Sequence, residues 1–286
     1  MTSSNKIAVL ADVHANLYAL EAVLFHATKK NRAEEIWFLG DAVGYGPEPN
    51  LCLGLLMKHV NPGAWVLGNH DEAMRYPPAD EQLVTKQRPT LETLLTPRAD
   101  QIGTLADTYE AYKLNYELLE AFPERFNFLL SRPFETRIDP EFFLVHGGIR
   151  NGTPTTTYTK NLWDARDEFD ALAKRFPNSK PRICFAGHSH LPACFKGKLT
   201  AAGYEFEKMD LNAGMKLQLD ENNWLLNPGS VGQPRDNDWR ASYMLLDCAD
   251  QTVTLHRVEY DLQATQELMK RRGMPANLIN RLAVGR

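Results

Sequence analysis

Six short apolar runs recur along the chain, and each is followed within two residues by polar or glycine residues. After Ala64–Leu67, for example, the chain reads Gly68-Asn69-His70-Asp71. The other five runs are Ile7–Leu10, Ile36–Leu39, Phe142–Val145, Ile183–Ala186 and Trp224–Leu226. Runs of this length and composition predict buried β-strands. Because open sheets bind ligands at the carboxyl ends of their strands, we expect the polar residues to meet at one reactive edge.

Helical patterns alternate with these predicted strands. Leu17, Leu20, Val23 and Leu24 follow the first run at helical spacing, and a second amphipathic pattern covers residues 162–176. Alternating strands and helices predict a layered α/β fold. At 286 residues the chain can bury a large core, and we expect one domain over residues 1–286.

The segment from Glu72 to Arg137 differs from the rest of the chain. Four prolines interrupt its first half, and a long helical pattern runs from Ile102 to Leu119. It contains no apolar run of the strand type. We therefore predict a mostly helical insertion at 72–137 that overhangs the reactive edge.

Composition narrows the classes of function. The formal net charge of -4 argues against a protein that coats nucleic acid, so a nucleic-acid partner is not expected. No run is long enough to span a membrane and no secretory leader opens the chain, so we expect a cytoplasmic protein without membrane contact. The four cysteines are scattered, which favours reduced thiols in a reducing compartment. The oligomeric state is not fixed by the sequence.

The strand ends collect oxygen and imidazole donors without a thiolate. One histidine at a strand end is usually a hydrogen-bonded structural residue, but seven donors placed in this way favour a metal centre. Two ions that share one carboxylate would use all seven, an arrangement typical of phosphoester hydrolysis. Manganese is our first expectation, and iron, zinc, nickel or cobalt would suit the same donors. The seven predicted ligands are Asp12, His14, Asp41, Asn69, His146, His188 and His190.

The order of these motifs resembles the calcineurin-like metallophosphoesterase superfamily. The motifs are Asp12-x-His14, Gly40-Asp41, Gly68-Asn69-His70-Asp71, His146 after an apolar run, and Gly187-His188-x-His190. The resemblance implies a four-layer α-β-β-α sandwich with a dinuclear centre. It also implies that Asp12, His14 and His190 hold one ion. Asn69, His146 and His188 would hold the other, and Asp41 would bridge them.

Within the superfamily, the chain is similar to a small prokaryotic phosphodiesterase-type branch related to diadenosine tetraphosphatases. Protein phosphatases carry Asp and Arg three and four residues after the bridging carboxylate, where this chain has Gly44 and Tyr45. A phosphate-clamping arginine is therefore missing from its usual place. Arg150 and Arg235 follow two of the ligand loops and are the candidates to replace it.

The resemblance places His70 at the substrate phosphate, as an imidazolium that stabilises charge or as a general acid. Asp71 is the adjacent candidate to assist it, and Asn69 would face both metal and substrate. Asn16 and Asn227 are expected to brace the ligand loops. The expected reaction is in-line attack by a metal-bridging hydroxide on a small phosphodiester or a nucleotide-type phosphoanhydride.

Three alternative functions remain open at this point. The chain could be a phosphomonoesterase or protein phosphatase of the same superfamily. It could also be a non-catalytic protein-interaction scaffold, although such relatives have lost site residues and this sequence keeps all seven ligands and His70. A nuclease would call for a basic surface, which the acidic balance does not favour.

Overall fold

The computed structural model describes residues 5–78, 105–150, 153–155, 157–200 and 203–286. Two mixed sheets and a short hairpin make up its β structure. The first sheet has the order β10-β13-β12-β1-β2 and the second has the order β3-β4-β7-β11-β8-β9. The strands of the first sheet are β1 (Lys6–Leu10), β2 (Glu35–Phe38), β10 (Lys216–Gln218), β12 (Ala241–Asp247) and β13 (Thr252–Val258). Those of the second are β3 (Glu135–Ile138), β4 (Phe142–Val145), β7 (Ile183–Ala186), β8 (Ala193–Thr200), β9 (Gly203–Lys208) and β11 (Asn223–Asn227).

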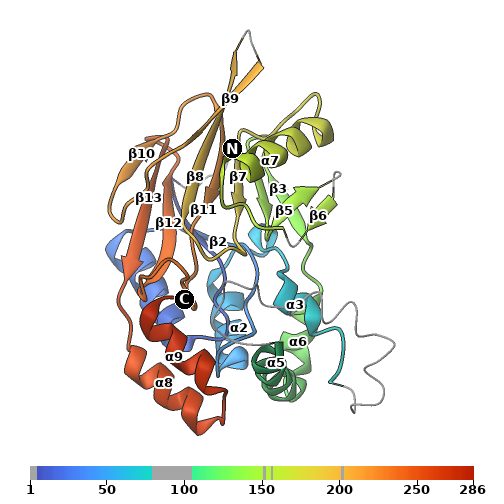
Figure 1. The fold of residues 1–286 in the computed structure, drawn as a ribbon, viewed down its shortest axis with the longest axis vertical. Coiled ribbons are helices and arrows are strands. Elements are labelled where there is room, and N and C mark those ends of the chain that lie inside the picture. The colour runs from blue at the N-terminus through green and yellow to red at the C-terminus, as the bar shows by residue number, and fades with distance from the viewer. Residues whose placement is uncertain (1–4, 79–104, 151–152, 156, 201–202) are drawn as a thin grey trace.

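The two sheets pack face to face, with helices on both outer faces. Trp37 of the first sheet meets Phe142 and Phe185 of the second in the core between them. Helices α1 (Leu17–Phe25) and α2 (Pro49–His59) share a second core with the outer face of the first sheet. Helix α7 (Leu162–Arg175) covers the outer face of the second sheet through Phe169 and Leu172. The expected α-β-β-α sandwich is therefore confirmed (Figure 1).

Parallel pairing brings the carboxyl ends of the central strands together. Strand β1 is parallel to β2, and β7 is parallel to both β4 and β11. The hairpin β5 (Gly148–Arg150) and β6 (Thr153–Thr155) follows β4 directly. Five of the six predicted strands are present, and each of the five delivers its polar residues at this common edge.

The sixth predicted strand, Ala64–Leu67, does not form. A 3₁₀ turn, η2 (Pro62–Ala64), occupies its first residue, and Trp65 makes a single parallel bridge to Phe38. The ladder stops there because the amide of Leu67 donates instead to the carbonyl of Pro133, at 2.7 Å. Residues 64–67 still lie beside the end of β2, and the short helix α3 (Asn69–Ala73) begins directly after Gly68.

Helices gather at the end of the molecule near the strand carboxyl ends (Figure 1). Within the span 72–137, the described residues form α5 (Leu105–Glu120), α6 (Pro123–Leu130) and the start of β3, while 79–104 lie outside the description. Helix α8 (Leu262–Arg271) packs against α1, and α9 (Ala276–Val284) packs against α8. A π-helical turn, η1 (His26–Lys30), extends α1. No helix in the described part of the chain could span a membrane.

Candidate metal centre

The loops after β1, β2 and β7 hold their polar residues in an unusual backbone conformation. Asp12, His14, Asp41, His188 and His190 all have positive φ, between 46° and 62°. This left-handed region costs an L-residue roughly 1–2 kcal/mol. The surrounding backbone enforces it, because the amide of Asp12 donates to Gly40 and that of His14 donates to Asp41. Strain concentrated at five neighbouring positions is typical of a functional site.

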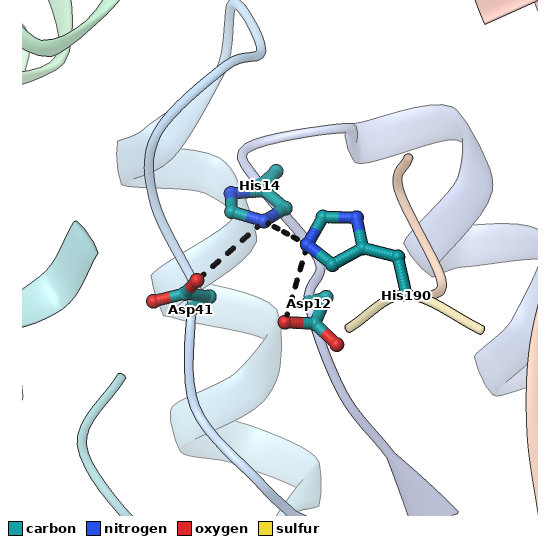
Figure 2. A group of neighbouring side chains, drawn as sticks. All are labelled: Asp12, His14, Asp41 and His190. Carbon is teal, nitrogen blue, oxygen red and sulfur yellow. Dashed lines mark hydrogen bonds and ion pairs between the residues drawn. The ribbon is translucent and has the colours of Figure 1, made fainter. Parts of the chain in front are cut away.

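One group of four side chains lies between the two sheets at this edge (Figure 2). Asp12, His14, Asp41 and His190 each offer a ligand atom, and all four atoms lie within 4.8 Å of one another. The Nε2 atom of His14 lies 3.6 Å from Asp41 Oδ2, and that of His190 lies 3.5 Å from Asp12 Oδ1. All four residues are buried.

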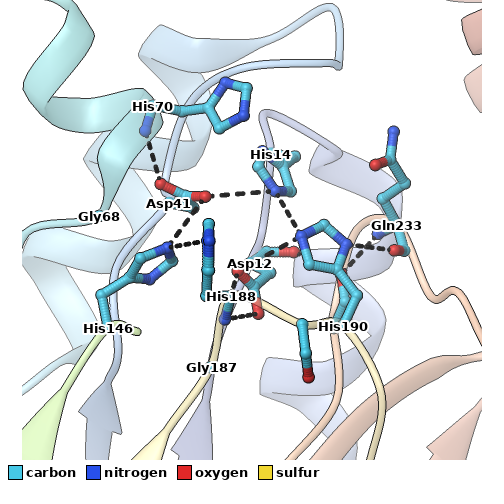
Figure 3. A network of polar contacts seen from close by, with 12 residues as sticks. Asp12, His14, Asp41, Gly68, His70, His146, Gly187, His188, His190 and Gln233 are labelled. Atoms are coloured by element: carbon cyan, nitrogen blue, oxygen red, sulfur yellow. Dashed lines mark hydrogen bonds and ion pairs between the residues drawn. The ribbon is translucent and has the colours of Figure 1, made fainter. Parts of the chain in front are cut away.

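A second group shares Asp41 with the first. It consists of Asp41, His146 and His188, whose ligand atoms also lie within 4.8 Å of one another. His146 Nε2 is 3.2 Å from both Asp41 Oδ2 and His188 Nδ1. The side-chain oxygen of Asn69 joins this group, at 3.0 Å from His146 Nε2. The seven predicted ligands thus come together as two sets that meet at Asp41, and Figure 3 labels six of them, all except Asn69.

The protonation of three imidazoles follows from what their Nδ1 atoms contact. Nδ1 of His14, His146 and His190 faces the backbone carbonyl of Val43, Leu39 and Gln233, at 2.9, 2.8 and 2.6 Å. A carbonyl only accepts, so each Nδ1 carries a proton, and the neutral rings of His14 and His190 present a lone pair at Nε2. His14 Nε2 and His190 Nε2 then face each other at 3.1 Å. Two lone pairs at this distance need a positive charge between them, which a metal ion supplies.

The charges in this cluster depend on one another: burial and the Asp41 carboxylate raise the pKa of Asp12 to about 8. Burial would raise the pKa of Asp41, but the charges of His146, His70 and His14 hold it well below its usual range. Burial would lower the pKa of His146, but the Asp41 carboxylate outweighs burial and raises it to about 9. Burial lowers the pKa of His14 and His190 well below the ordinary value, so both are neutral ligands at pH 7. The Asp and His residues therefore form a dimetal-type site.

Several polar residues hold the ligand loops without joining the two groups. Asn227 donates to the carbonyl of Gly187 at 2.7 Å and to Ser189 Oγ at 3.0 Å. Asn16 donates to the carbonyl of Gly232 at 2.9 Å and caps α1. Both asparagines brace the loops as expected from the sequence.

Asp71 points into the backbone of the neighbouring loop. Its Oδ2 accepts from the amides of Asp41 and Gly68, at 2.9 and 3.1 Å, and its Oδ1 accepts from Val43 at 3.2 Å. The backbone of Asp41 is thereby fixed to the start of α3. Gly68 has to lack a side chain here, because a Cβ atom would come within 2.1 Å of Asp41 Oδ1.

His70 lies beside the two groups, with its ring on the His14 side (Figure 3). Its amide donates to Asp41 Oδ1 at 2.8 Å, and its ring meets His14 edge-on with the centroids 4.9 Å apart. The Tyr45 ring packs against it at 4.6 Å. Within the described residues, no hydrogen-bond partner contacts the His70 ring, so packing against Tyr45 and His14 sets its orientation.

The two predicted phosphate-binding arginines are Arg235 and Arg150. Arg235 lies near the site, since its amide donates to the carbonyl of His190 at 3.3 Å and its guanidinium lies 5.7 Å from the Tyr45 ring centroid. Arg150 ends β5, and its side chain lies outside the described part of the structure.

Three residues near the centre were not identified from the sequence. Tyr45 contacts both His14 and His70, and Tyr158 stacks on His188 with centroids 4.2 Å apart. Arg281 of α9 also contacts Tyr45, with Cζ 5.6 Å from the ring centroid. Of these three residues, only Arg281 could have been noticed in the sequence. It is an arginine on the apolar helix face formed by Leu278 and Leu282, where a charged residue is unusual.

The fold and this site define a metal-dependent phosphoesterase, and comparison with known proteins gives the family. Residues 5–211 match the model of the calcineurin-like phosphoesterase family. The chain belongs to this family and is a phosphoric ester hydrolase. The uncharacterized protein MJ0912 of Methanocaldococcus jannaschii is 30% identical over 287 residues, covering 98% of both chains.

Two solved structures extend the comparison. A metallophosphoesterase from Sphaerobacter thermophilus superimposes with a TM-score of 0.77 and 33% identity, covering 99% of this chain and 100% of that one. A hypothetical protein of Pyrococcus horikoshii, PH1004, has a TM-score of 0.67 and 20% identity, with 98% of each chain covered. The second comparison shows a shared fold. Both cover nearly the whole chain, including the helices after residue 211.

Proposed function

We propose that the protein hydrolyses small phosphodiesters or nucleotide-type phosphoanhydrides at a dinuclear metal centre. The observation that carries this proposal is the Tyr45 ring, which lies 4.6 Å from the His70 ring at a position where protein phosphatases have an arginine. An aromatic ring there cannot pair with the second charge of a phosphomonoester dianion. A diester or an internal anhydride phosphate carries only one negative charge and does not need that pairing.

In this proposal Asp12, His14 and His190 hold one ion, and Asn69, His146 and His188 hold the other. Asp41 contacts both. The nitrogen and oxygen donors suit manganese, which is our proposed ion. When bound, the two ions neutralise charge on the phosphoryl oxygens and lower the pKa of a coordinated water.

His70 supplies the hydrogen-bond donor to the reacting phosphate in the proposed mechanism. Burial lowers its pKa to about 4, and the positive charges of Arg235 and Arg281 add to this lowering. The ring is therefore neutral at pH 7 and offers one N–H. Donation of that N–H to the leaving oxygen or to a phosphoryl oxygen stabilises the charge that develops there. Asp71 is a positioning residue in this scheme, because both of its oxygens already accept backbone amides.

Helix α5, which belongs to the predicted insertion at 72–137, also affects the size of substrate that the site can accept. Asn115 of α5 accepts from the amide of Gly44 at 3.0 Å and donates to the carbonyl of Gly46 at 2.9 Å. Helix α5 therefore packs directly on the Gly44–Gly46 loop beside His70. A helix fixed at this place favours a small substrate over a folded phosphoprotein.

The test compares kcat/KM with manganese for four substrates: a chromogenic diester, the matching monoester, diadenosine tetraphosphate and a phosphopeptide. We expect the diester or the tetraphosphate to be the best substrate, and His146→Ala to abolish turnover of all four. A phosphopeptide or a simple monoester turned over tenfold better than both others would contradict the proposal. Absence of any turnover by the manganese-loaded protein would favour the scaffold alternative.

We also propose a cytoplasmic location. Cys52, Cys184 and Cys194 are buried free thiols. Free buried thiols are typical of proteins kept in a reducing compartment.

A further inference from the structure

Two arginines from distant parts of the chain lie against the same tyrosine. Arg235 comes from the loop after β11, and Arg281 comes from α9. Their Cζ atoms lie 5.7 and 5.6 Å from the centroid of the Tyr45 ring. Cation–π contacts of this kind contribute modestly to stability, and they fix the positions of the guanidinium groups.

Arg235 has no acidic partner among the residues that the structure describes. It donates through Nη2 to Gln233 Oε1 at 2.9 Å, while its buried Nε has no partner. Arg281 is 1% exposed; its Nε donates to the main-chain oxygen of Arg286, the last residue, and its Nη2 has no partner. Burial and Arg235 lower the pKa of Arg281 to about 10, so it is charged at neutral pH. A partly buried cation without a counter-ion is costly, which points to an anionic ligand of Arg235.

Tyr45 links the two arginines to the metal centre. The same ring contacts His70 and His14, whose centroids lie 4.6 and 4.7 Å from it. The Arg235 amide donates to the carbonyl of His190, so the loop that carries the guanidinium is fixed to the metal centre. The positive charge of Arg235 lies close enough to lower the pKa of His14, His70 and His190.

We propose that Arg235, supported by Tyr45 and Arg281, binds a second phosphate group of the substrate, next to the phosphoryl group attacked at the metals. Arg235 is partly exposed and contacts this phosphate. Arg281 is a positioning residue that acts through Tyr45 and through its charge. The inference rests on the proposed function and selects among its substrates: it favours a nucleotide-type phosphoanhydride over a simple diester.

The experiment measures kcat/KM with manganese for diadenosine tetraphosphate, bis(4-nitrophenyl) phosphate and 4-nitrophenyl phosphate. For Arg235→Met we expect kcat/KM for the tetraphosphate to fall about 10- to 100-fold more than that for the diester, as for loss of a charge-assisted hydrogen bond. Arg281→Met should change the same ratio by a smaller factor, and Arg281→Lys should restore it.

Arg257→Met is the matched control. The Arg257 side chain is 5% exposed, but Asp236 and Asp238 pair with it, so its loss should leave the substrate ratio at the wild-type value. An equal loss for all three substrates in Arg235→Met would overturn the inference. An equal loss for the tetraphosphate and the monoester would also overturn it, because the arginine would then act on the attacked phosphate.

A binding measurement separates this inference from the proposed function. By calorimetry, the manganese-loaded wild type should bind ADP at least tenfold more tightly than AMP, and Arg235→Met should remove this difference. This holds even if no substrate is turned over, in which case the proposed function fails alone. Equal affinity of the wild type for ADP and AMP would defeat the inference, whatever the activity.

Discussion

Asp41 is the residue whose substitution should affect the metal centre most widely. Its Oδ2 faces His14 in one group and His146 in the other. In Asp41→Asn the shared negative charge is lost, so we expect most of the bound metal and nearly all turnover to disappear. His146→Ala should mainly empty the second site. Metal analysis after gel filtration checks both.

The control for this prediction is Asp250→Asn, which removes a carboxylate from an exposed ion pair with Lys216. It should retain wild-type metal content, since exposed ion pairs contribute little. Two ions per chain bound by Asp41→Asn at wild-type affinity would show that Asp41 does not bridge the centre.

His70 should behave differently from the ligands because its ring lies outside both groups. We expect His70→Ala to keep its metal and to lose roughly 10²- to 10⁴-fold in kcat, the range for a lost general acid or charge-stabilising donor. His59→Ala, a substitution on α2, serves as the control and should keep full activity. If His70→Ala loses an ion, the residue is a ligand and our assignment is wrong.

At the scale of elements, the Asp71 carboxylate connects α3 to the loop after β2. In Asp71→Asn one acceptor oxygen becomes an amide that faces a backbone N–H. We expect a loss of about 1–3 kcal/mol in the free energy of unfolding. Metal affinity should also fall, because the amides of Asp41, Gly68 and Val43 then share a single acceptor oxygen.

Measurement at saturating manganese distinguishes positioning from catalysis for Asp71. If Asp71 only positions its neighbours, kcat of Asp71→Asn should recover to within a few-fold of the wild type when metal is in excess. A deficit of 10²-fold or more under those conditions would mean that Asp71 takes part in the chemistry. Urea unfolding of both proteins supplies the stability value.

The elements also explain which parts of the site could be predicted from the sequence. Asp12, Asp41 and His146 follow apolar runs directly, and strand pairing alone brings such positions together. The direction of the Asp71 side chain depends on whether a strand or a helix turn follows Leu67, which local pattern does not decide. Arg281 and Asn115 reach the site through the packing of α9 and α5. No local sequence pattern around Arg281 or Asn115 predicts which residues it contacts.

At the scale of the whole molecule, metal should contribute to stability as well as to chemistry. Its ligands come from both sheets, so bound ions link the two halves of the sandwich. A ligand present at 100 times its dissociation constant stabilises the folded state by about 2.7 kcal/mol. For a chain of this size we expect a chelator to lower Tm by about 5 °C or more. Differential scanning calorimetry with and without chelator checks this.

Asp41→Asn is the control for the effect of the chelator on Tm. Its Tm should change little with chelator, because the ions are already lost. A wild-type Tm that is insensitive to both chelator and added manganese would show that the ions do not couple to folding, and that the ligand loops keep their left-handed backbone without them.

The place of β1 in the first sheet has a consequence for how the protein is made. Strand β1 lies between β2 and β12, and its loop is held by Val231 and Gly232, whose amides donate to Ala11 and Asp12. While the chain is still on the ribosome, the first ligands to emerge lack half of their surroundings. Strand β1 gains its second neighbour only when residues 241–247 arrive. We therefore expect a nascent chain stalled before β12 to carry all seven predicted ligands without a finished site to hold the ions.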